Sequence, residues 1–131
     1  MKRLILGIFA FVLLSVCSTA VSAQKATRIN FGRGATSTIV TGTLNGYRSQ
    51  RTFVIRVRRA QTLTTESAGK NYITVGVEAP RRSTYEQDMA ADCHDRNEVT
   101  PTSAGDYRIT FNECKKADRW RGTFRLRVSV R

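Results

Sequence analysis

Few side chains of this chain suit catalysis or metal binding. The one histidine, His94, lies between Cys93 and Asp95, and Cys114 follows 20 residues after it. Together they could offer nitrogen, sulfur and oxygen ligands. However, consecutive ligands at 93, 94 and 95 would strain a tetrahedral site, and no paired-cysteine spacing is present. We therefore expect no metal and no cofactor.

The motifs of common enzyme classes are missing from the sequence. It has no Gly-x-Ser-x-Gly nucleophile turn and no phosphate-binding loop. Gly32-Arg33-Gly34 is too short for a dinucleotide site and indicates a turn. The carboxylates of Asp92 and Asp95 lie in a polar stretch, without the apolar surroundings that tune a catalytic acid. We expect a protein that binds rather than catalyses.

Residues 1–23 have the pattern of a secretory signal peptide. A basic start is followed by the uncharged run Leu4–Leu14 and then by the small residues Val21-Ser22-Ala23. That run of 11 residues is shorter than the ~20 that span a bilayer as a helix. We expect cleavage after Ala23, not a retained anchor, and a periplasmic or secreted protein. A lipoprotein attached at Cys17 is the other alternative, although Val16 is bulky where such sites have a small residue.

Cleavage would leave one domain, residues 24–131, with two cysteines. In an exported chain two cysteines most often pair, so we expect a disulfide between Cys93 and Cys114. The bond would close 21 residues (114 − 93) and stabilise the fold by roughly 3 kcal/mol through chain entropy.

The charge is strongly positive and dominated by arginine. The 131 residues carry 22 Lys or Arg against 10 Asp or Glu, a net charge of +12. Loss of Lys2 and Arg3 would leave +10 (12 − 2). Such a charge favours an anionic partner: an envelope glycan or lipid, or an acidic cleft on another protein. Nucleic acid is disfavoured by export and by the scarcity of aromatics among the basic residues.

Alternation of apolar and polar residues predicts the fold. Short strands are expected at 28–31, 36–43, 52–58, 61–65, 72–77, 107–111 and 124–131. A capping pattern, Ser83-x-x-Glu86, indicates either one or two helical turns or an irregular loop. With no long helical period, the sequence predicts an all-β chain: a single antiparallel β-sandwich of about seven to eight short strands.

Two loops carry residue types that dominate protein interfaces, namely Tyr, Trp and Arg. Asn45-Gly46 predicts a hairpin whose tip presents Tyr47 and Arg48. The loop Lys115–Arg121 joins the last two strands and carries Trp120. As alternatives, Tyr47 packs on its own turn and Trp120 is a lid over the end of the sandwich.

Outward-facing arginines offer a different surface. Arg56 and Arg58 share one strand face, and Arg125 and Arg127 share another. If these strands adjoin, the four residues form a basic stripe for an anionic polymer. The alternative is a solvated face whose charges protect the sheet from aggregation.

Several short segments resemble small exported β-sandwich proteins of bacteria. They are Ile29–Ser37, Gly42–Tyr47, Phe53–Leu63 and Ala104–Tyr107. The resemblance spans most of residues 28–130 and is closest to the periplasmic inhibitors of goose-type lysozyme. These in turn look like the invertebrate-type lysozyme inhibitors and the prepeptidase C-terminal domains.

The resemblance implies a β-sandwich that plugs the substrate cleft of a lysozyme. Family inhibitors work from the turn tyrosine and from basic residues of the final loop, which correspond to Tyr47, Lys115 and Arg119. Ser103 and Tyr107 lie near the Ser-Gly-x-Tyr motif of related inhibitors. We therefore expect the partner-binding residues to be Tyr47, Arg48, Ser103, Tyr107, Lys115, Lys116, Arg119 and Trp120. The alternative function is an envelope module that binds anionic glycan or lipid through arginine-rich strand faces.

Overall fold

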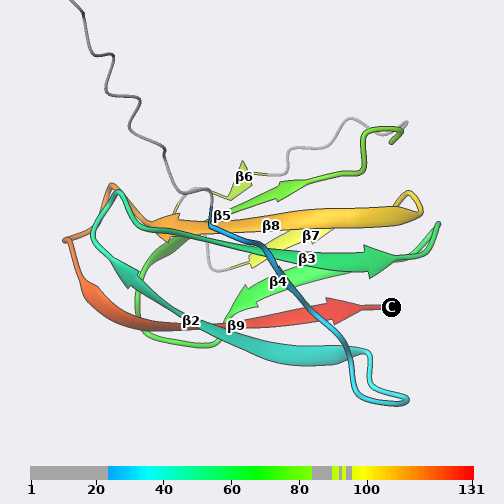
Figure 1. Ribbon diagram of the computed structural model, residues 1–131, viewed down its shortest axis with the longest axis horizontal. Coiled ribbons are helices and arrows are strands. Elements are labelled where there is room, and N and C mark those ends of the chain that lie inside the picture. Colours follow the sequence, from blue (N-terminus) through cyan, green and yellow to red (C-terminus); the bar gives the residue numbers. More distant parts are fainter. Residues whose placement is uncertain (1–23, 84–89, 92, 94–95) are drawn as a thin grey trace, which may run out of the picture.

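The computed structural model describes residues 24–83, 90–91, 93 and 96–131 and shows two stacked β-sheets (Figure 1). One sheet has the order β1-β3-β8-β5-β6 and the other β2-β9-β4-β7. The strands are β1 (Thr27–Arg28), β2 (Ser37–Asn45), β3 (Gln50–Val57), β4 (Leu63–Ser67), β5 (Ile73–Glu78), β6 (Ala90–Ala91), β7 (Arg96–Val99), β8 (Gly105–Glu113) and β9 (Arg121–Val130). The predicted all-β sandwich is confirmed. In the described ranges no helix is long and apolar enough to cross a membrane.

Two expectations about strand pairing are corrected. β1 pairs with β3 in the parallel sense, so this sheet is mixed, whereas the other strand pairs are antiparallel. The Asn45-Gly46 turn does not join a hairpin, because β2 and β3 belong to different sheets. The chain crosses from one sheet to the other at this turn. Gly46 supplies the positive φ of 81° that the crossing requires.

The core follows the alternation of the long strands. Along β3, Phe53, Ile55 and Val57 face inward, as the alternation of apolar and polar residues there indicates. The alternating apolar residues of the last two long strands are buried as well: Tyr107, Ile109, Phe111, Phe124, Leu126, Val128 and Val130. Between the sheets, the ring of Phe111 stacks on that of Phe124 at 5.1 Å. It also meets the ring of Phe53 edge-on at 5.5 Å, and this trio ties the two sheets together.

The segment before β2 closes one side of the sandwich. Ile29 is buried, and its N–H donates to the Val54 carbonyl at 2.8 Å. Arg28 adds a two-pronged ion pair with Asp106 at 2.8 and 3.2 Å. These hydrogen bonds hold the pKa of the Asp106 carboxyl below its ordinary value. Both side chains are about half exposed, so the pair orients the segment more than it stabilises the fold.

Strand β7 was not predicted from the sequence. Its outward residues are Arg96 and Glu98, and Asn97 and Val99 face inward, so only one apolar residue signals the strand. The capping pattern that begins at Ser83 runs into residues 84–89, which lie outside the described part. His94, Asp95 and the expected signal peptide, residues 1–23, also lie outside it.

Candidate functional site

Three connections meet at one end of the sandwich, which we call the loop end: residues 46–49, 68–72 and 114–120. Strand register brings them together, because Asn45 pairs with Arg121, Gln50 with Asn112, and Ile73 with Glu113. β2 and β8 therefore finish where β3, β5 and β9 start. The 68–72 connection runs to the same end from β4, whose last residue lies opposite Leu126. In Figure 1 all three connections lie on the left, opposite the C-terminus.

Tyr47 joins two of these connections. Its hydroxyl donates to the Ala117 carbonyl at 2.8 Å, while the side chain stays 36% exposed. On the same turn, Gly46 has no side chain, and a Cβ there would lie only 2.9 Å from Cζ of Arg119. The Arg119 guanidinium therefore lies against the backbone of the turn. Tyr47 and Arg119, 72 residues apart in sequence, form one surface.

Trp120 covers the end of the core, which agrees with the alternative interpretation of this residue as a lid over the end of the sandwich. The ring packs partly buried against the core, and Nε1 donates to the Tyr72 carbonyl at 3.0 Å. The Trp120 backbone N–H donates to the buried carboxylate of Glu113 at 3.2 Å. Glu113, which we did not predict, thus fixes the backbone of Trp120 just before β9 begins. Trp120 supports the loop end rather than projecting from it.

The loop end carries a concentration of positive charge. Arg48, Lys115, Lys116 and Arg119 are all exposed there, beside one exposed carboxylate, Asp118. Five of the eight predicted contact residues are therefore both exposed and close to one another; these are the four cations and Tyr47. This arrangement could meet an acidic surface.

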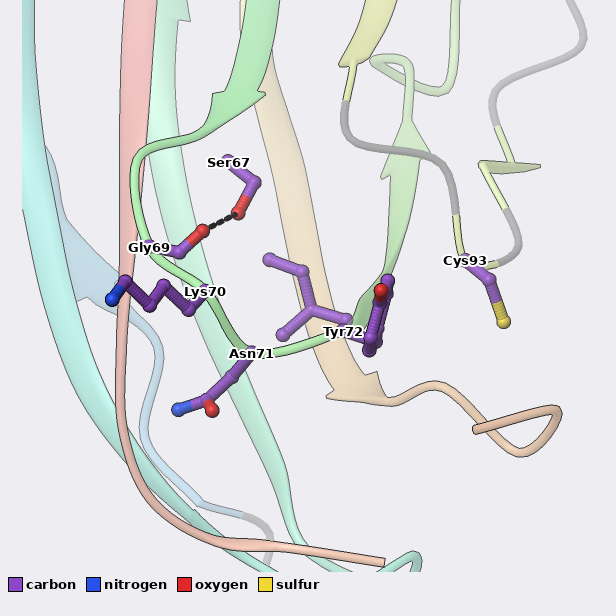
Figure 2. Close-up of a pocket in the computed structure, with 7 residues that line it drawn as sticks. Ser67, Gly69, Lys70, Asn71, Tyr72 and Cys93 are labelled. Atoms are coloured by element: carbon purple, nitrogen blue, oxygen red, sulfur yellow. Dashed lines mark hydrogen bonds between the residues drawn. The ribbon is translucent and has the colours of Figure 1, made fainter. Parts of the chain in front are cut away.

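The 68–72 connection was missed by sequence reasoning. It carries Lys70 and Tyr72, and Tyr72 is 65% exposed, the most exposed large hydrophobic side chain in the described part. A groove of about 670 Å³ separates this connection from residues 116–120, with the disulfide beside it. Figure 2 shows a second hollow along the same connection, in which Tyr72 lies between Asn71 and Cys93. The signal available in the sequence was a tyrosine directly after the loop residues Gly69-Lys70-Asn71.

The predicted disulfide is present. Cys93 and Cys114 are bonded, with their Cα atoms 5.1 Å apart. Both sulfurs are used in the bond, so neither is available as a thiolate for the metal site considered above. Cys114 is buried at the end of β8, and the bond ties the segment before β7 to the loop end.

Removing this bond is expected to destabilise the protein. In the Cys93→Ser, Cys114→Ser double variant the 21-residue loop gains conformational freedom in the unfolded state. The free energy of unfolding should fall by about 2–4 kcal/mol. Urea unfolding of the variant and of the wild type, with free thiols counted first, measures the change. An unchanged midpoint, or two free thiols in the native wild type, would contradict the prediction.

Ser103 and Tyr107 lie at the opposite end of the sandwich. β8 begins there, because Gly105 pairs with Val57. Tyr107 is 1% exposed, and its hydroxyl accepts a hydrogen bond from the Ser103 N–H at 3.0 Å. These two residues shape the turn that precedes β8. They cannot share one contact surface with Tyr47 and Arg119.

The strand arginines do not form one stripe. Arg56 and Arg125 belong to strands of different sheets, so they lie on opposite outer faces. Several arginines of these faces contact carboxylates, Arg127 with Glu66 at 3.7 Å and Arg96 with Glu98 at 2.8 Å. On the described surface this pattern fits the solvated-face interpretation better than a polyanion site.

Comparisons with known proteins give a shared fold. No family model and no curated protein matches the chain. Among solved structures, Aeromonas hydrophila PliG, a periplasmic inhibitor of g-type lysozyme, matches with TM-score 0.64 and 20% identity, over 81% of this chain and 96% of that one. Salmonella Typhimurium PliG matches with TM-score 0.58 and 15% identity, over 82% and 98%. A mutant of the Escherichia coli inhibitor PliG-Ec matches with TM-score 0.57 and 13% identity, over 81% and 97%.

Proposed function

We propose that the protein is an exported inhibitor of lysozyme, with the g-type enzyme as its target, and that the loop end is the inhibitory surface. The observation that carries the proposal is the joining of the 46–49 and 114–120 connections by the Tyr47 hydrogen bond. The two joined connections carry exposed cations. The sandwich that presents them has the same fold as the PliG inhibitors. Export with cleavage after Ala23 would place the protein in the periplasm or outside the cell.

The chemistry of the target supports this surface. Glycoside hydrolases use carboxylates around the scissile bond, so their clefts attract cations. Arg119 is the group best placed to enter such a cleft, because it is exposed and its guanidinium lies beside Tyr47 and the Gly46 turn, where the two connections meet.

Lysis assays with purified g-type, chicken-type and invertebrate-type lysozymes test the proposal. We expect the exported protein to inhibit the g-type enzyme and to retain inhibition when salt is raised, as for a buried contact. Inhibition of none of the three would overturn the proposal. Binding to an anionic glycan or lipid that weakens steeply with salt, without inhibition, would favour the envelope-module alternative.

The Tyr47→Phe variant tests whether the hydroxyl matters for inhibition. It removes one hydrogen bond, worth about 0.5–1.5 kcal/mol net, and frees the 114–120 connection at Ala117. We expect the inhibition constant to rise about 2–12-fold. Tyr107→Phe is the matched control, because it deletes the hydroxyl that accepts from Ser103 at the opposite end. Equal losses in both variants would place the inhibitory surface elsewhere.

A further inference from the structure

Along one edge of β2, no other strand of the described residues pairs with it. β2 hydrogen-bonds to β9 alone among the described strands. The other strands at sheet edges are short: β1 and β6 have two residues each, and β7 has four, including Arg96 and Glu98. Short length and charge are common ways in which proteins protect a sheet edge from pairing. β2 has neither, since its nine residues, STIVTGTLN, contain no charge and no proline.

The groups available for pairing form a symmetric stretch. The Val130 N–H donates to the Thr36 carbonyl, and antiparallel ladders alternate. The backbone groups of Thr38 and Val40 therefore face β9, whereas those of Ser37, Ile39 and Thr41 face away. At Thr43 the stretch ends, because Nε of Arg51 donates to its carbonyl at 3.0 Å. The free stretch is centred on Ile39, which is 40% exposed.

We propose that β2 pairs with β2 of a second copy of this chain, antiparallel and with a twofold axis at Ile39. Ile39 then faces Ile39 of the partner copy, and Ser37 faces Thr41. Every outward backbone donor and acceptor of these three residues finds a counterpart. After loss of residues 1–23 the molecule would carry a net charge of +10 (12 − 2), and β2 itself contributes none of it, so two β2 edges can meet without like charges on the paired strands.

This arrangement is independent of lysozyme inhibition. The antiparallel β2 pair joins the two four-stranded sheets into one continuous sheet. Asn45 leads from β2 to the loop end, so the twofold axis places the two loop ends at opposite ends of the assembly. Both remain accessible. A strand-edge interface is small, so we expect a weak dimer in rapid exchange.

Sedimentation velocity of the exported protein over about 1 µM to about 1 mM tests the pairing. We expect the average mass to rise toward twice that of the monomer, and to rise further with salt, which screens the repulsion between two basic molecules. A monomer at every concentration, or a dimer that salt dissociates, would overturn the proposal.

Two variants test the interface itself. Ile39→Lys places like charges across the axis and should abolish the dimer, with lysozyme inhibition unchanged. Thr64→Lys adds the same charge on the same sheet, at an interior strand, and should dimerise as the wild type does. Dimerisation of Ile39→Lys, or its loss in Thr64→Lys, would overturn the proposal.

Two cysteine variants test the register. This test remains valid even if Ile39→Lys does not fold. Across the axis the two Cα atoms of residue 39 lie about 5.5 Å apart, within the range of a disulfide. Oxidised Ile39→Cys should give a covalent dimer. Thr41→Cys should not, because its counterpart is Ser37. Cross-linking of Thr41→Cys alone, or of neither variant, would overturn the register.

Discussion

Replacing Phe111 by alanine is expected to lower the free energy of unfolding by about 3–5 kcal/mol. The side chain is 0% exposed and lies between Phe53 of its own sheet and Phe124 of the other. Truncation removes the contacts that tie the sheets together and leaves a cavity that neither rigid sheet can collapse to fill. For a domain of this size each kcal/mol shifts the melting temperature by about 4–8 °C. We therefore expect Tm to fall by at least about 12 °C.

Tyr72→Ala is the matched control for this prediction. It removes an aromatic ring that is 65% exposed, and surface substitutions of this kind change stability by about 0.5 kcal/mol or less. Thermal unfolding of both variants, followed by circular dichroism, separates the two cases. A drop in Tm of a few degrees for Phe111→Ala, or equal drops for both, would show that the aromatic trio does not hold the sheets together.

The fold was predictable wherever one strand face is continuously apolar. Phe124, Leu126 and Val128 alternate with polar residues along β9, and their burial could be inferred from period alone. Pairing could not be inferred in this way. Asn45-Gly46 favours a hairpin locally, but β2 and β3 each gain a partner strand in a different sheet, so the turn became a crossing between sheets. Tertiary pairing overrode the local preference of the turn.

The candidate site was predictable by residue type but not by position. Tyr, Arg and Trp in loops pointed to Tyr47 and Arg119, and the register of two sheets then brought these residues to one end. The family resemblance added Tyr107, whose hydroxyl accepts a hydrogen bond from Ser103 in the turn at the other end. Tyr107 alternates with polar residues along its strand as Ile109 does, a pattern that predicts burial and argues against a contact role. Buried polar groups such as Glu113 leave no comparable signal in a single sequence.

Reversing the charge of Arg119 should have the largest effect on the proposed inhibition. Arg119→Glu would place a carboxylate where the proposed cleft carries carboxylates, so the cost includes repulsion as well as the lost contact. Residues at the centre of interfaces cost about 2 kcal/mol or more when removed, and the inhibition constant should rise at least about 30-fold. Arg119 is exposed, so Tm should stay within about 2–4 °C of the wild type.

Arg58→Glu separates contact from long-range electrostatics. It makes the same change of two charge units at an exposed arginine just after β3, at the end where Val57 pairs with Gly105. If Arg119 enters the cleft, only Arg119→Glu loses inhibition, and the loss persists at high salt, because contacts inside a cleft are poorly screened. Equal losses in both variants that disappear at high salt would mean that net charge, and not the loop end, governs the interaction. If only Arg58→Glu lost its lysozyme inhibition, the inhibitory surface would lie at the opposite end of the sandwich.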